Sequence, residues 1–361
     1  MDFIKTYTEY LPQETKNIKH LFIEVPSLVS KDLNDYLDNL QIEFEQWHNA
    51  GFTFIELETI YIASTQSDDF VLVQIALCIE KILKFIKFSK DYEFTIEVTA
   101  EAISDRSLLH LKNIGVNRLV FNFYEIKLFY EYDLHYLSDK VRKLGFNNLS
   151  VDYLYNSTDK QTLKSIEKNL QEIIAAGIKH IYIEDIYAER NVKEALIKSE
   201  REQYHFIRNF LLDNNFKQSE LLAFNTENKF KSKHNLAYWN GKDYLGLGVE
   251  TVSKIGNLRF KNRLIESDYI SNFNKESLYS LEEGMTNDDL MFDYFVLAIN
   301  NLKGFSEKDF QRYTGRSMPG FYLQKLEKLS RTGFLQKVDE NWILTSKGLD
   351  KINFILSSFI C

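Results

Sequence analysis

Six short runs of apolar and β-branched residues recur through the first half of the chain. Amphipathic stretches with helical spacing separate them, for example LVQIALCIEKILKFI (72–86) and TLKSIEKNLQEIIAAG (162–177). Strands and helices that alternate with a repeat of about 25–40 residues favour parallel βαβ units. The six predicted strands are HLFIEV (20–25), TIYIAS (59–64), EFTIEV (93–98), RLVFNF (118–123), NLSVDYLY (148–155) and HIYIEDIY (180–187).

Such a repeat fits either a doubly wound open sheet or a curved partial barrel, and the pattern alone does not separate them. No GxGxxG motif follows any of the six runs, which argues against a dinucleotide-binding sheet. In both folds a ligand site would lie at the C-terminal ends of the strands. The polar residues expected there are Glu24, Ser64, Glu97, Asn122, Asp152 and Asp185.

The character of the sequence changes near residue 221, where aromatic residues become frequent. GKDYLGLG (241–248) predicts a turn and then a tight segment in which glycine lets the backbone approach a ligand or another strand closely. A linker is expected over roughly 271–284. We therefore expect three parts, residues 1–220, 221–270 and 285–361.

The last part has three helical patterns, two short strands around DEN (339–341) and a final helix from Lys347. This order resembles a winged-helix module, which raises the question of nucleic-acid binding. However, the segment carries ten basic and nine acidic residues, and the whole chain has a net charge of −8. No basic footprint stands out, so we expect no nucleic-acid partner.

The chain has two cysteines, Cys78 in an apolar run and Cys361 as the last residue. This number excludes a disulfide framework and any metal site built on three cysteines. Cys78 is expected to be a small buried residue. The N-terminus lacks the pattern of a signal peptide, and no stretch approaches the length of a membrane span, so a cytoplasmic location is expected.

Several segments resemble, in order, the HemW and oxygen-independent coproporphyrinogen oxidase-like radical-SAM family. The most specific is SKHNLAYWNGKDYLGLGVETVSK (232–254), which matches the family's HNxxYW followed by DYLGxGxGAxS. RFKN (259–262) with Tyr269, NIGVNRLVF (113–121), VDYLYN (151–156) and the C-terminal run extend the match over nearly the whole chain. The resemblance implies a partial (β/α)6 barrel followed by a small winged-helix-like α+β domain.

The same resemblance implies that the family's iron–sulfur site has been lost. LFIEVPSLVSKDLNDY (21–36) aligns without gaps on LYIHIPWCxxKCxYCDF, which places Leu28, Asp32 and Asp35 at the three cluster cysteines. A [4Fe–4S] cluster needs soft thiolate ligands. Leucine cannot ligate iron, and two hard carboxylates are poor substitutes, so no cluster is expected.

The positions implied for SAM binding have also changed. The family's GGGTPS becomes ASTQSD (63–68), so Ala63, Ser64 and Thr65 replace glycines whose lack of a Cβ admits the ligand. GVQS becomes NFYE (122–125) and GLP becomes NST (156–158). Glu97 and Asp152 stay at family positions, although an acidic residue at a strand end can equally be structural.

In the family the HNxxYW motif has been linked to haem, which implies His234, Asn235, Tyr238 and Trp239 as candidate haem-binding residues. A neutral imidazole can be an axial iron ligand, and Tyr and Trp offer flat apolar surfaces to a porphyrin. In the alternative interpretation His234 hydrogen-bonds the asparagine or the backbone, and the two aromatic residues pack on the barrel.

Three functions stay open. The first is a cluster-less HemW-like pseudoenzyme, chaperone-like, that binds haem or another tetrapyrrole, or a haem-accepting protein. The second is a barrel enzyme with magnesium or manganese held by strand-end carboxylates, but no catalytic His pair, GxSxG or P-loop supports it. The third is an interaction protein without a small ligand. The first is favoured, and catalytic residues are not expected.

Overall fold

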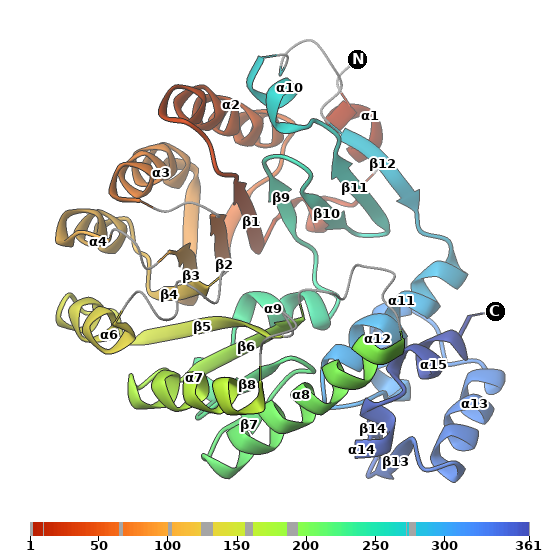
Figure 1. Cartoon of the computed structure of the whole chain (residues 1–361). Coiled ribbons are helices and arrows are strands. Elements are labelled where there is room, and N and C mark those ends of the chain that lie inside the picture. The colour runs from red at the N-terminus through yellow and green to blue at the C-terminus, as the bar shows by residue number, and fades with distance from the viewer. Residues whose placement is uncertain are drawn as a thin grey trace.

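In the computed structural model, the residues described are 3–9, 11–64, 68–99, 103–123, 133–155, 162–185, 194–271, 273 and 279–360. A nine-stranded sheet forms the centre, in the order β7-β8-β6-β5-β4-β3-β2-β1-β9. Neighbouring strands from β1 to β6 run parallel. Figure 1 shows their helices in an arc outside the strands, so the partial barrel is the correct one of the two predicted folds.

The parallel strands are β1 (His20–Val25), β2 (Phe54–Ser64), β3 (Ile86–Val98), β4 (Arg118–Phe123), β5 (Asn148–Tyr155) and β6 (His180–Asp185). The outer helices are α2 (Ser30–Asn49), α3 (Asp69–Ile82), α4 (Asp105–Asn113), α6 (Leu134–Lys143), α7 (Leu163–Ala175) and α8 (Glu194–Asp213), with α1 (Phe3–Thr8) near the N-terminus. All six predicted strands are confirmed, apart from residues 186–187, which lie outside the described part. β2 and β3 begin earlier than predicted.

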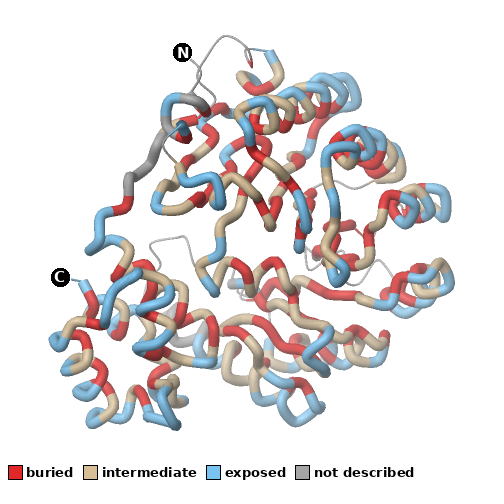
Figure 2. The backbone as a smooth tube through the Cα atoms, turned by 180° about the vertical axis from the view of Figure 1, so that it is seen from behind, coloured by how far each residue is buried: buried red, intermediate tan, exposed pale blue. Residues whose placement is uncertain are grey.

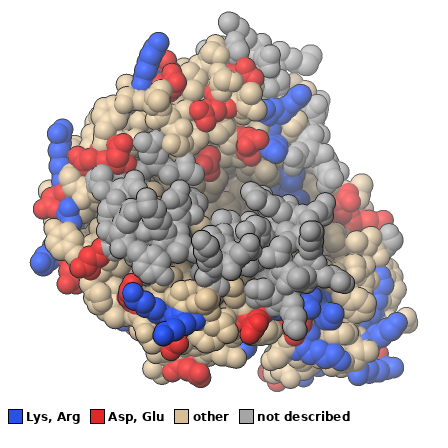
Figure 3. Space-filling model, in the orientation of Figure 1, with Lys and Arg blue, Asp and Glu red and all other residues tan. Residues whose placement is uncertain are grey.

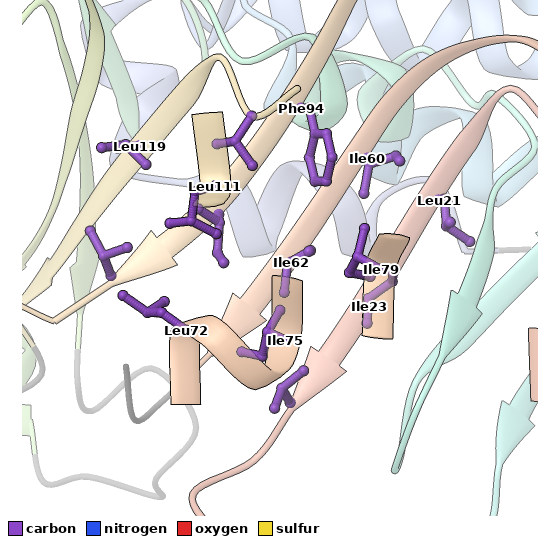
Figure 4. Close-up of a cluster of buried hydrophobic side chains, with 14 of the residues drawn as sticks. Leu21, Ile23, Ile60, Ile62, Leu72, Ile75, Ile79, Phe94, Leu111 and Leu119 are labelled. Atoms are coloured by element: carbon purple, nitrogen blue, oxygen red, sulfur yellow. The ribbon is translucent and has the colours of Figure 1, made fainter. Parts of the chain in front are cut away.

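Alternation along the strands separates the core from the interior of the barrel. In β2, Ile60 and Ile62 are buried against the helices, whereas Tyr61 and Ala63 line the interior. Figure 4 shows the apolar side chains of β1–β4 meeting those of α3 and α4. Figure 2 shows the same division, with buried residues along the inner stretches of the chain and exposed residues on the outer turns of the helices. Burial of each such side chain contributes about 1.5–3 kcal/mol.

Cys78 lies in this core, on α3, and is 4% exposed. Its thiol donates a hydrogen bond to the Leu37 carbonyl oxygen at 3.3 Å. Burial raises the pKa of Cys78 to about 12, because a thiolate would be poorly solvated there. The prediction of a small buried residue is confirmed; Cys361 lies outside the described residues.

The segment after residue 221 adds a strand on each side of the six parallel strands. β8 (Ala223–Asn225) pairs antiparallel with β6 and with β7 (Lys217–Gln218), and β9 (Leu245–Leu247) pairs parallel with β1. Gly248 has φ +97°, and a Cβ there would collide with the Tyr36 hydroxyl and the Glu24 carbonyl oxygen. The predicted close approach of a glycine-bearing backbone to another strand is therefore confirmed.

The predicted linker over 271–284 is wrong for its second half. Residues Tyr279–Gly284 form β12, which pairs with β11 (Leu258–Asn262) beside β10 (Val252–Ile255) in an antiparallel sheet. α10 (Glu266–Ser271) precedes it. Tyr279 anchors the strand because its side chain is buried and donates its hydroxyl proton to Glu43 of α2.

The C-terminal domain has its own hydrophobic core, in which the rings of Phe295 and Phe359 stack 3.8 Å apart. Its elements are α11 (Asn287–Asn300), α12 (Glu307–Thr314), α13 (Gly320–Arg331), β13 (Leu335–Val338), β14 (Asn341–Leu344), α14 (Ser346–Leu349) and α15 (Ile352–Ser357). The order predicted from the sequence is confirmed, with the final helix divided into two. Figure 3 shows basic and acidic side chains interspersed over the face that it draws.

Within the described residues, no helix combines the length and apolar character needed to cross a membrane.

Candidate functional site

The strands β1–β6 and the short helix α9 (Lys233–Trp239) enclose a cavity of about 290 Å³, which we call the lumen cavity. Side chains from all six strands reach it, together with four residues of the HNxxYW motif. α9 begins after Ser232, whose hydroxyl accepts a hydrogen bond from the Asn235 amide at 3.2 Å. The sequence-predicted haem residues His234, Asn235, Tyr238 and Trp239 all line this cavity.

His234 is held on both sides of its ring. Nδ1 lies 2.8 Å from the Thr59 hydroxyl, and Nε2 lies 2.8 Å from the Tyr238 hydroxyl. Its backbone amide donates to the Glu93 carboxylate. Burial lowers the pKa of His234 to about 3, so the imidazole is neutral. His234 could bind iron through a ring nitrogen only if one of these two hydrogen bonds were broken.

Tyr238 and Trp239 extend from α9 toward different partners. The Tyr238 ring packs edge-on against Tyr244, with centroids 4.4 Å apart. The Trp239 indole N–H donates to Glu220 at 2.7 Å. Glu220 is buried, which raises its pKa to about 7. Each of these aromatic residues is half-buried and so keeps part of its ring surface available.

Three of the predicted strand-end carboxylates interact with one another: Glu97 and Asp152 line the lumen cavity, and Glu24 lies at the end of neighbouring β1. Glu97 accepts hydrogen bonds from the Tyr61 hydroxyl at 2.7 Å and the Asn122 amide at 3.3 Å. Burial, and then the charge of Glu97, raises the pKa of Glu24 to about 7. The same two causes, in that order, raise the pKa of Asp152 well above its ordinary value.

These carboxylates do not form a metal site in the described part of the chain, which contains no group of three or more His, Cys, Asp or Glu that could hold an ion. Ser64 is buried at the end of β2. The side chain of Asp185 lies outside the described residues, so its predicted role stays a prediction.

The positions implied for the cluster ligands carry other chemistry. Leu28 is 7% exposed and packs in the core, where it offers no lone pair to iron. Asp32 lies in the first turn of α2, and Asp35 is exposed on the next turn. These residues do not fit a [4Fe–4S] cluster, because none supplies a thiolate.

At the positions implied for SAM, Ala63 carries its methyl group into the lumen cavity. The nearby Ser64 side chain is buried. Thr65, residues 124–125 and residues 156–158 lie outside the described part.

Known proteins resemble the chain over most of its length. It is 24% identical over 327 residues to the heme chaperone HemW of Bacillus subtilis, covering 84% of this chain and 86% of that protein. The heme chaperone HemW of Lactococcus lactis is 21% identical and covers 92% and 91%. A putative heme chaperone HemW-like protein of Buchnera aphidicola is 24% identical and covers 84% and 85%. No family model matches the sequence.

A solved structure carries the same fold. The coproporphyrinogen III oxidase HemN of Escherichia coli, described as a radical SAM enzyme, superposes with a TM-score of 0.79 at 17% identity and covers 99% of this chain and 93% of that one. The chain is therefore HemW-like in sequence over most of its length, and it has the fold of a radical SAM enzyme. The radical-SAM-type barrel predicted from the sequence is confirmed.

The sequence reasoning missed a buried carboxylate that holds the HemW-like segments together. Glu43 of α2 is fully buried. It accepts hydrogen bonds from the Gly248 amide, the Asn262 amide, and the hydroxyls of Tyr269 and Tyr279. The signal was present in the sequence, because Glu43 interrupts an apolar helical stripe that includes Leu40, Phe44 and Trp47.

A larger cavity of about 700 Å³ separates the HemW-like barrel from the C-terminal domain. We call it the interdomain cleft. Residues 239–243 and 254–257 form one wall, and α11, α12 and the turn between them form the other. Trp239 borders both this cleft and the lumen cavity. The HNxxYW motif therefore ends at the boundary between the two cavities.

Proposed function

We propose that this HemW-like protein binds haem or a related tetrapyrrole and has a chaperone-like role, without an iron–sulfur cluster or SAM chemistry. The proposal takes its ligand class from the relatives, which are named as heme chaperones. The observation that carries it is the placement of Trp239, which ends the HNxxYW motif against a cavity of about 700 Å³. Small-molecule sites typically measure roughly 300–1,000 Å³.

The loss of cluster chemistry is supported by Leu28, whose buried side chain cannot ligate iron. It is also supported by Cys78, which is engaged with the Leu37 carbonyl and has a raised pKa. A cysteine binds a metal as its thiolate, so a thiol that resists ionisation in the core cannot replace a missing cluster cysteine. A haem-accepting partner and the non-catalytic status are part of the same proposal.

Haem titration into the purified full-length chain tests the proposal. We expect a saturable Soret band at one haem per chain, because the cleft is large enough for a single macrocycle. The absence of a saturable band would contradict tetrapyrrole binding and favour the alternative hypothesis of an interaction protein without a small ligand. Magnesium and manganese in a thermal-shift assay are the matched control, for which no stabilisation is expected.

Anaerobic reconstitution with iron and sulfide tests the cluster separately. We expect no stable cluster absorbance after desalting, because no thiolate is available at residues 28, 32 and 35. A stable absorbance near 410 nm with about four irons per chain would overturn this half of the proposal. The two halves can fail independently, since haem binding does not require a cluster.

A further inference from the structure

The interdomain cleft differs from the lumen cavity in size and in the character of its lining. It is more than twice as large, at about 700 Å³ against about 290 Å³. Partly exposed aromatic and aliphatic side chains reach it from both domains, namely Trp239, Leu290, Leu297 and Tyr313. Flat apolar surfaces on two facing walls suit a planar, largely apolar ligand.

The cleft lining carries more basic than acidic side chains, which favours an anionic ligand. Its lining includes four basic residues and two acidic ones. Lys254 pairs with Asp243 at 3.2 Å, and Arg312 pairs with Asp309 at 2.9 Å. These two pairs use both acids and leave two lysines.

The remaining lysines come from the two sides of the cleft. Lys242 follows α9 in the barrel, and Lys303 lies in the turn between α11 and α12. Both are exposed, and neither forms an ion pair with any described residue. A planar ligand with two carboxylate groups would meet a lysine from each domain.

The cleft has no ready ligand for iron among its described residues. Its lining contains no His, Cys or Met. The two tyrosine hydroxyls are engaged, since Tyr294 donates to the Ser306 carbonyl oxygen at 2.9 Å and Tyr313 donates to Asp293. His234 lies in the lumen wall with both ring nitrogens hydrogen-bonded.

We infer that the interdomain cleft is the tetrapyrrole site, and that it holds the ligand by its ring face and its carboxylates, not by its metal. The inference rests on the proposed function and deepens it. Its consequence is that a porphyrin without iron binds as well as haem. Lys242 and Lys303 are then the residues that set the affinity for a dicarboxylate.

Titration of the full-length chain with haem and with metal-free protoporphyrin tests this inference. We expect dissociation constants within about threefold of each other, because removal of the iron removes no protein contact. The double variant Lys242→Glu/Lys303→Glu should weaken both ligands by roughly tenfold or more, since it replaces two attractive charges by two repulsive ones. Both lysines are exposed, so the variant should keep the wild-type melting temperature.

A matched control makes the same change in net charge away from the cleft, in the C-terminal domain. Lys328→Glu/Lys351→Glu alters two exposed lysines outside the cleft and should leave both affinities unchanged. Haem binding with metal-free porphyrin at least about 100-fold weaker would overturn the inference and leave the proposed function intact. Equal loss of affinity in the two double variants would also overturn it. Failure of both ligands to bind would reject the proposed function itself.

Discussion

Glu43 is the residue on which four segments between residues 248 and 279 converge. Burial raises its pKa to about 7, against hydrogen bonds from Tyr269, Tyr279, Gly248 and Asn262 that lower it. A folded-state pKa above the ordinary value of 4.5 means that the native state binds the proton more tightly. The contribution of this protonation to stability is therefore present at low pH and is lost as pH rises through about 4.5 to 7.

Glu43→Gln removes this titration. Wild type should lose stability relative to the variant between pH 5 and pH 8, by up to about 3 kcal/mol for a shift of this size. Urea unfolding of both proteins at the two pH values measures the difference. Glu80→Gln, at an exposed position of α3, is the control and should show a pH-independent difference. A pH-independent difference for Glu43→Gln would contradict the raised pKa.

At the scale of single residues, the sequence predicted which residues line the site better than it predicted their hydrogen-bond partners. The HNxxYW motif marked the segment that forms α9. The hydrogen-bond partners of His234, however, include Thr59 on β2 and Glu93 on β3, which are far away in the chain. Such partners depend on which side chains the barrel brings inward. The interrupted apolar stripe marks Glu43 itself, but its four donors come from separate segments and could not be predicted.

Among the elements, the predicted strands were the most accurate, because a parallel strand covered by helices is a continuous apolar run that stands out from its surroundings. β12 was missed because YSLEEG has apolar residues only at Tyr279 and Leu281, too few to show an alternation. The segment pairs at the edge of a small antiparallel sheet, where pairing with β11 decides its structure.

The turn after β9 depends on glycine for two reasons. Gly248 has φ +97°, and its Cα faces the Tyr36 hydroxyl and the Glu24 carbonyl oxygen. Gly248→Ala should therefore destabilise the protein by about 3 kcal/mol or more, since backbone strain and steric overlap add.

Gly51→Ala is the matched control for this turn. Gly51 has φ +92° with nothing within 4 Å of a Cβ, so its substitution carries the backbone strain alone, about 1 kcal/mol. Chemical denaturation of both variants gives the comparison. Equal losses would show that the close approach at Gly248 contributes nothing to stability.

At the scale of the molecule, the described residues form two hydrophobic cores, one in the barrel and one from Met291 to Phe359. The second core is large for its segment, with stacked rings at Phe295 and Phe359 and a further ring contact between Phe295 and Tyr322. A segment of about 75 residues can support an independent fold.

Residues 285–361 should therefore fold when expressed alone. We expect a helical circular dichroism spectrum and a cooperative thermal transition, because the apolar contacts of this domain lie largely within it. A gradual, non-cooperative melt would show instead that the barrel is needed to complete its core. The full-length chain provides the reference spectrum.

The family resemblance predicted the barrel, and the residue pattern predicted the order of the C-terminal elements. It did not predict the interdomain cleft, whose two walls lie in residues 239–257 and 290–313. No local pattern reports how two separately folded cores meet. The unpaired state of Lys242 and Lys303 is likewise a property of the assembled chain.

Trp239 lies between the two cavities and lines both the lumen cavity and the interdomain cleft. Its indole is fixed at one point, the hydrogen bond to Glu220. Rotation of the ring about this hydrogen bond would enlarge one of the two cavities and reduce the other. A ligand that displaced Trp239 from one cavity would therefore change the space available in the other.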